Sequence, residues 1–126
     1  MREVVRALML AIVLAFSWMP SHAAIMNPFG PLGLPLTKED FSKMNAAVTP
    51  LLDEDSLALG TTREWSNPKS GNSGTVTLIS RFETNFEGRK LPCRKIRYHF
   101  SIRNIADPYN LEINRCRVED GSWKIL

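Results

Sequence analysis

The pattern that most limits the fold of this 126-residue chain is a strict alternation of apolar and polar residues in its C-terminal part. Apolar residues occupy every second position from Ile96 to Ile102, and Arg97, His99 and Ser101 lie between them. A period of two indicates an antiparallel strand with one buried face and one solvated face.

Further strands are predicted on either side of this one. Residues 75–86 are rich in Val, Thr, Ile and Phe, and Glu87-Gly88-Arg89 then predicts a turn. After the alternating strand, Leu111 and Ile113 repeat the pattern. Asp120-Gly121 then predicts a turn. A short closing strand should follow, with Trp123 and Ile125 on its inward face.

A helix is predicted before the strands. Thr37 should be its N-cap and accept a hydrogen bond from the backbone N–H of Asp40, while Leu36 packs on Phe41 as a hydrophobic staple. Pro50 should end or kink the helix, because proline has no N–H to donate. One apolar face follows at spacings of three and four residues: Phe41, Met44, Val48 and Leu51.

The first residues have the features of an export signal. Arg2 and Arg6 precede an apolar run of about a dozen residues, and small residues at 21–23 suit signal peptidase. A membrane-spanning helix needs roughly 20 residues. We therefore expect residues 1–23 to be a signal peptide, with an uncleaved membrane anchor as the alternative. No cysteine lies near the cut to carry a lipid, so we expect an exported protein that is not lipid-anchored.

Residues 24–36 form a Pro/Gly-rich apolar arm that cannot be regular structure. The arm is too apolar for an ordinary flexible linker. It should therefore either lie along its own domain or meet a partner.

Cys93 and Cys116 are the only two cysteines, and an oxidising compartment favours their pairing. A disulfide that closes a loop of about two dozen residues would stabilise the fold by about 3 kcal/mol. Each cysteine is out of phase with the apolar set of its strand, so both sulfurs should lie on the outer face unless a bulge intervenes. A catalytic thiol or a metal pair is the alternative interpretation.

These patterns together predict an α+β domain over residues 37–126. One N-terminal helix should pack on a four- to five-stranded antiparallel meander with one disulfide.

Three short motifs occur in the order and nearly the spacing of a known family. They are Trp65-x-Asn67-Pro68-x-Ser70-Gly71 followed by Gly74, then Cys93-Arg94, then Cys116-Arg117-x-x-Asp120-Gly121-x-Trp123. On these residues, over roughly 57–126, the chain resembles the 17 kDa outer-membrane surface antigen family of Gram-negative bacteria. The resemblance implies an envelope protein with a small β-rich domain and no established enzymatic activity, and we expect no cofactor. Well-known members carry a lipid on a cysteine that this chain lacks, so we expect a non-lipidated variant that is periplasmic, associated with the outer membrane or secreted.

The segment 65–76 also has an interpretation that needs no family. Asn67-Pro68 suits the start of a turn, and Gly71 and Gly74 allow positive φ, so we expect a long hairpin between the strands of Trp65 and Val76. The alternative is a loop that binds an anion or a glycan through Asn, Ser and backbone N–H groups. A small secreted inhibitor or protein-interaction module acting through residues 67–74 is therefore the alternative function.

Charge is unevenly distributed along the chain. Acidic residues outnumber basic ones six to three between residues 37 and 64, whereas nine basic residues accompany four acidic ones between residues 81 and 117. The basic strands are either a solvated sheet face or a patch for anionic envelope components, such as lipopolysaccharide, lipid head groups or acidic wall polymer. The candidate anion-binding residues are Arg94, Lys95, Arg97, Arg115 and Arg117.

No catalytic or metal-binding set stands out. His99 is the only histidine after residue 23, which argues against a triad or a zinc site. No pair of carboxylates suggests glycoside cleavage. We expect no catalytic residue, no metal and no nucleic-acid partner, and an enzyme ranks third behind an envelope-binding domain and an interaction module.

Overall fold

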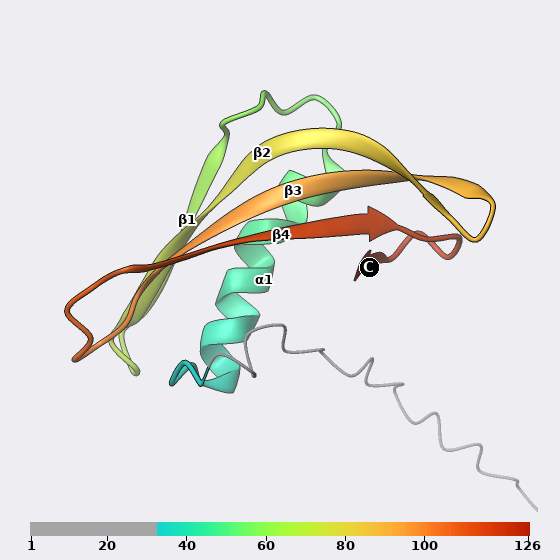
Figure 1. Cartoon of the computed structure of the whole chain (residues 1–126). Coiled ribbons are helices and arrows are strands. Elements are labelled where there is room, and N and C mark those ends of the chain that lie inside the picture. Colours follow the sequence, from blue (N-terminus) through green and yellow to red (C-terminus); the bar gives the residue numbers. More distant parts are fainter. Residues whose placement is uncertain (1–32) are drawn as a thin grey trace, which may run out of the picture.

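The computed structural model describes residues 33–126, which form one helix and a curved antiparallel sheet that arches over it (Figure 1). The predicted α+β class is confirmed. The sheet has five strands in sequence order, so it is a simple meander. The elements are α1 (Lys38–Asp53), β1 (Thr62–Asn67), β2 (Asn72–Phe86), β3 (Arg89–Ser101), β4 (Tyr109–Arg117) and β5 (Trp123–Ile125).

The helix begins as predicted and ends later than predicted. Thr37 Oγ1 accepts a hydrogen bond from the Asp40 N–H, and the Asp40 carboxylate accepts one from the Thr37 N–H, which completes a capping box. Pro50 was expected to end or kink the helix, but α1 continues to Asp53. The turn after Pro50 is held by a bond from the Glu54 N–H to the Pro50 carbonyl.

The core lies between α1 and the concave face of the sheet. Met44, Val48 and Leu51 from the predicted helix face are buried there, and Phe41 and Leu36 pack against its edge. The sheet contributes the predicted alternating set of β3 and its continuation, together with residues of β1, β2 and β4: Trp65, Val76, Leu78, Ile96, Tyr98, Phe100, Ile102 and Ile113. The alternation in the sequence therefore identified the buried face of the sheet.

Gly74 serves a purpose other than the predicted one. Gly71 has the expected positive φ of 76°, whereas Gly74 is absent from the residues with positive φ. A Cβ atom at Gly74 would lie 2.3 Å from the His99 carbonyl oxygen and 2.7 Å from Trp65 Nε1. Glycine is needed here because the Trp65 indole packs across the neighbouring strand.

The predicted disulfide is confirmed, since Cys93 and Cys116 are bonded and lie directly opposite each other on β3 and β4. Both are out of phase with Ile96 and Ile113, so they lie on the convex face, away from the helix. Leu91 and Val118 cover them there in a second small apolar cluster. The bulge that could have changed this arrangement is in β2, between Leu78 and Ser80.

The short last strand is only partly as predicted. The turn at Asp120-Gly121 is confirmed by a Gly121 φ of 85° and by the bond from the Val118 N–H to the Ser122 carbonyl. Trp123 packs against the main core, but Ile125 remains 43 % exposed. Ile125 lies on β5 at one edge of the sheet, whereas α1 packs mainly against β1 and β2 toward the other edge.

The predicted signal peptide and most of the apolar arm lie outside the described residues. Of the arm, Leu34 and Leu36 are partly buried against the core, as expected for a segment that packs on its own domain. Within residues 33–126 no helix is both long and apolar enough to cross a membrane. The disulfide is consistent with an oxidising location outside the cytoplasm.

Candidate functional site

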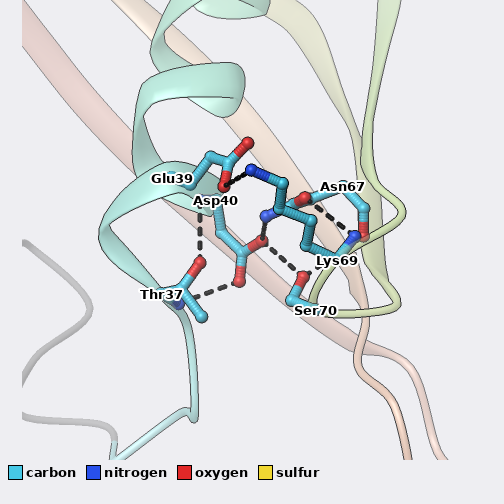
Figure 2. Close-up of polar contacts among 6 residues, drawn as sticks. All are labelled: Thr37, Glu39, Asp40, Asn67, Lys69 and Ser70. Atoms are coloured by element: carbon cyan, nitrogen blue, oxygen red, sulfur yellow. Dashed lines mark hydrogen bonds and ion pairs between the residues drawn. The ribbon is translucent and has the colours of Figure 1, made fainter.

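The first motif folds into a loop whose polar side chains point toward the start of the helix. Asp40 Oδ1 accepts hydrogen bonds from Asn67 Nδ2 at 2.8 Å and from Ser70 Oγ at 2.6 Å, and Oδ2 accepts one from Asn72 Nδ2 at 2.8 Å. Figure 2 shows Asp40 between Thr37 on one side and the loop residues on the other. We call Asp40, Asn67, Ser70 and Asn72 the Asp40 cluster.

Electrostatics within this cluster favour the ionised carboxylate. Burial opposes ionisation, but the hydrogen bonds from Ser70, Thr37, Asn72 and Asn67 outweigh it and lower the pKa of Asp40 to about 2. The N-terminus of α1 adds a partial positive charge beside the carboxylate. The cluster is therefore a clamp between the loop and the helix.

The remaining motif residues of the loop shape the turn itself. The Lys69 N–H bonds to Asn67 Oδ1 and the Gly71 N–H bonds to the Asn67 carbonyl, so Pro68 sits at the corner of an Asx turn. Asn72 extends the clamp by donating to the Pro35 carbonyl and accepting from the Arg103 N–H. The polar groups that could have bound a glycan are engaged within the domain.

The candidate anion-binding residues are divided between the two faces of the sheet. Arg94, Arg115 and Arg117 are in phase with Ile96 and Ile113, and so lie on the concave face. Lys95 and Arg97 lie on the convex face, with the disulfide, and Arg97 forms an ion pair of 2.8 Å with Glu112. The alternation in the sequence already placed Arg94 on the buried face, because residue 94 is in phase with the apolar residues of β3.

Two of the concave-face arginines contact the ring of Trp123. The guanidinium carbon of Arg94 lies 5.2 Å from the ring centroid, and that of Arg117 lies 5.9 Å away. Arg115 lies two residues before Arg117 on the same face of β4 and places its guanidinium 5.9 Å from the Tyr98 ring. We call Arg94, Arg115, Arg117 and Trp123 the arginine–tryptophan cluster.

The three arginines of this cluster have different surroundings. The Arg94 side chain is 6 % exposed and pairs with Asp55, so it is part of the fold. Arg117 is exposed and Arg115 is half-buried. Among the described residues, neither Arg115 nor Arg117 has a carboxylate at ion-pair distance. The Nε of Arg115 is buried without a hydrogen-bond partner, while the side chain forms a hydrogen bond with Tyr98. This pair of cations is the best candidate for contact with an external anion.

Arg115 also affects a buried tyrosine. Burial raises the pKa of Tyr98, and the positive charge of Arg115 partly opposes that rise. The phenol is therefore neutral at physiological pH and part of the core.

His99 lies on the convex face, away from both clusters. Its Nδ1 is 2.7 Å from Asn110 Oδ1, in a shallow hollow of about 520 Å³ that Ser73, Thr75 and Ser101 also line. Within residues 33–126 no three His, Cys, Asp or Glu side chains come close enough to hold a metal ion.

Comparisons with known proteins found no match to a protein family, to a curated protein or to a solved structure. The resemblance to the 17 kDa surface antigen family stays a prediction that rests on the three motifs.

Sequence reasoning missed the partners of two motif residues. Asn67 was assigned to a turn, and its bond to Asp40 spans 27 positions along the chain. Arg94 was assigned to a surface patch, and its bond to Leu51 spans 43 positions. One local signal pointed to the Asp40 cluster. Asp40 lies three residues after the N-cap, where a carboxylate can accept a hydrogen bond from the N-cap N–H and still accept others.

Proposed function

We propose that this chain is a non-enzymatic exported envelope protein, similar to the 17 kDa surface antigen, whose sheet binds anionic envelope components through Arg115 and Arg117. The observation that supports this most is that Arg115, whose guanidinium lies over the Tyr98 ring, and Arg117, whose guanidinium lies over the Trp123 ring, have no carboxylate partner among the described residues. Arginine recognises phosphate and carboxylate groups through paired N–H donors.

The motif residues support a non-catalytic role. Asn67, Arg94 and Trp123 are held by contacts within the domain, to Asp40, Leu51 and Asp53 respectively. Residues that position the helix against the sheet serve the scaffold. The arginine pair at its surface then supplies the binding chemistry.

The alternative function, an interaction module acting through the loop 67–74, has less support. Asn67, Ser70 and Asn72 direct their side chains to Asp40, which leaves Pro68, Lys69 and the half-buried Ser73 as the outward side chains of the loop. A recognition loop would be expected to present more of its polar side chains to solvent.

The two faces of the sheet provide a matched test. Replacing Arg115 and Arg117 with Glu should abolish salt-sensitive binding to vesicles that contain anionic phospholipid, because the concave cations are lost. Replacing Lys95 and Arg97 with Glu changes the net charge by the same amount on the opposite face and should leave most of the binding intact. Equal loss in both variants would mean that only net charge matters, and binding by neither protein would refute the proposal.

The same assay separates the candidate anions. Vesicles of anionic phospholipid, lipopolysaccharide and soluble acidic wall polymer are compared at low and high salt. All three carry anionic phosphate or carboxylate groups. The partner is the one that the protein binds most tightly, provided that this binding is weakened by salt and by the replacement of Arg115 and Arg117.

A further inference from the structure

Part of the edge of β2 has no neighbouring strand in the described chain. β1 pairs with β2 only from Asn72 to Thr77, and the loop before β1 extends this pairing to Leu78. Figure 1 shows β2 and β3 continuing past β1 to a projecting hairpin. We call residues 81–86 at the end of β2 the free edge of β2.

The backbone groups of the free edge point outward at every second residue. Both the N–H and the carbonyl of Leu78 bond on the β1 side, so those of Thr77 point to β3. The pairing of β2 with β3 skips one residue at the bulge between Leu78 and Ser80. Beyond the bulge the alternation continues, so the N–H and carbonyl groups of Ser80 and Phe82 point to β3. The N–H and carbonyl groups of residues 81, 83 and 85 are therefore available to another strand.

The free edge also carries two exposed aromatic side chains. Phe82 is 37 % exposed and Phe86 is 42 % exposed, and both lie on the convex face. Natural edge strands usually avoid exposed apolar side chains, because such edges attract other strands. Two phenylalanines on one uncovered edge indicate a surface that is covered in the assembled protein.

The sequence of the free edge is complementary to itself when read in opposite directions about Thr84. We propose that a second copy of this chain pairs antiparallel with the free edge, about a two-fold axis through Thr84. Phe82 then faces Phe86 of the second copy, and Arg81 lies beside Glu87 of the second copy, the first turn residue after β2. Cross-strand aromatic pairs and opposite charges both stabilise such a ladder.

The backbone directions fit this register. Glu83 faces Asn85 of the second copy, and both residues point their N–H and carbonyl groups outward, so they form a hydrogen-bonded pair. Two-fold symmetry repeats every contact. Thr84 faces its own copy at a non-hydrogen-bonded position, where the two side chains come closest.

Neighbouring registers are less favourable. An axis at Glu83 would place two glutamates opposite each other, which is destabilising. An axis at Phe82 would bring the hairpin of the second copy against Gly60 and Thr61, which already occupy the edge beside Leu78. The register at Thr84 leaves these residues clear.

This dimer would also bear on the proposed function. The axis is perpendicular to the sheet, so the concave faces of both copies lie on one side of a continuous sheet. Two arginine–tryptophan clusters could then contact one anionic surface together, which increases the apparent affinity. The dimer itself stands whether or not the anion-binding proposal holds, because its test is the oligomeric state alone.

The first test is sedimentation of the exported chain over a range of concentrations. A reversible monomer–dimer equilibrium is expected, and Phe82→Ser should raise its dissociation constant by at least about 10-fold, because two aromatic pairs are lost. Ile105→Ser is the matched control, since Ile105 is similarly exposed at 45 % but lies in the loop after β3. A monomer at all concentrations up to millimolar would overturn the proposal, as would equal effects of the two variants.

A charge exchange tests the register. Glu87→Arg should weaken the dimer because it places two arginines opposite each other, and adding Arg81→Glu should restore it. Arg81 also donates a hydrogen bond to the Leu57 carbonyl within its own chain. Restoration in the double variant could not come from that bond, because the double variant still lacks it.

Cross-linking tests the position of the axis. Cα atoms at non-hydrogen-bonded positions lie about 4.5 Å apart, within reach of a disulfide. Thr84→Cys should therefore give a covalent dimer under mild oxidation, with the Cys93–Cys116 bond intact by mass spectrometry. Thr75→Cys, on the part of β2 covered by β1, should not. Failure of Thr84→Cys to cross-link while the protein dimerises would reject this register, and preferential pairing with a different protein would reject the second copy as the occupant.

Discussion

Arg94 Nη1 donates a hydrogen bond of 2.7 Å to the carbonyl oxygen of Leu51, so a side chain of the sheet satisfies the C-terminal end of the helix. The same nitrogen reaches the Glu54 carbonyl at 3.2 Å, and Nη2 bonds to Asp55 Oδ1 at 2.5 Å. The last carbonyls of a helix have no partner within the helix and carry partial negative charge. Arg94 thus joins β3 to α1 through one buried guanidinium.

We expect Arg94→Ala to lower the free energy of unfolding by about 2–4 kcal/mol, because buried carbonyls lose a charged donor. Arg97→Ala is the control on the same strand. Its ion pair with Glu112 is exposed and should contribute at most about 1 kcal/mol. Urea unfolding followed by far-UV circular dichroism measures both, and similar losses would show that Arg94 has no special role.

The Asp40 cluster should make stability depend on pH at low pH. The pKa of Asp40 is about 2 in the folded state against an ordinary 3.8, so the carboxylate stabilises the fold fully above pH 3.8. This contribution, of about 2 kcal/mol, should be lost as pH falls from 3.8 through about 2.

Asp40→Asn should be less stable than the natural chain at pH 7 and should show a flatter stability profile between pH 4 and 2. Glu39→Gln is the control, because Glu39 is a neighbouring exposed acid that only contacts Lys69 at 3.8 Å. Chemical denaturation at stepped pH distinguishes the two. An unchanged slope in Asp40→Asn would contradict the clamp.

Gly74→Ala should destabilise the domain by about 2 kcal/mol or more, because the new methyl group meets the His99 carbonyl and the Trp65 ring. Thr75→Ala is the control at the next position, where the side chain is half-buried on the convex face. Thermal unfolding and the Trp65 fluorescence report the effect. Equal melting temperatures for both variants would mean that the indole moves aside without cost.

The sequence predicted those features that depend on local pattern. The alternation at Ile96–Ile102 identified the buried face of β3, and Thr37 identified the start of α1. Contacts between residues that are distant in the sequence were not predictable. Periodicity shows which face of a helix or strand is buried, but it does not show which other element packs against that face. Asp40 with Asn72 and Arg94 with Leu51 are of this kind. Gly74 shows a further limit, since a glycine required for space has the same signature as one required for positive φ.

The Cys93–Cys116 disulfide should be a structural bond that resists reduction while the protein is folded. Its sulfurs belong to residues that are 2 % and 3 % exposed, and Leu91 and Val118 cover them on the convex face. Thiol–disulfide exchange requires a thiolate to reach one of the sulfurs. A mild reductant at neutral pH should therefore leave the bond intact, and the same reductant in denaturant should cleave it.

Replacing both cysteines with alanine should lower the free energy of unfolding by about 3 kcal/mol, because the unfolded chain regains the freedom of the closed loop. Alkylation and mass spectrometry measure the accessibility of the bond, and urea unfolding measures its contribution. Rapid reduction of the folded protein would instead indicate that this end of the β3–β4 ladder opens readily. In that case the double alanine variant should lose much less than about 3 kcal/mol. A disulfide adds little to the free energy of unfolding where the two strands that it joins are already separated much of the time.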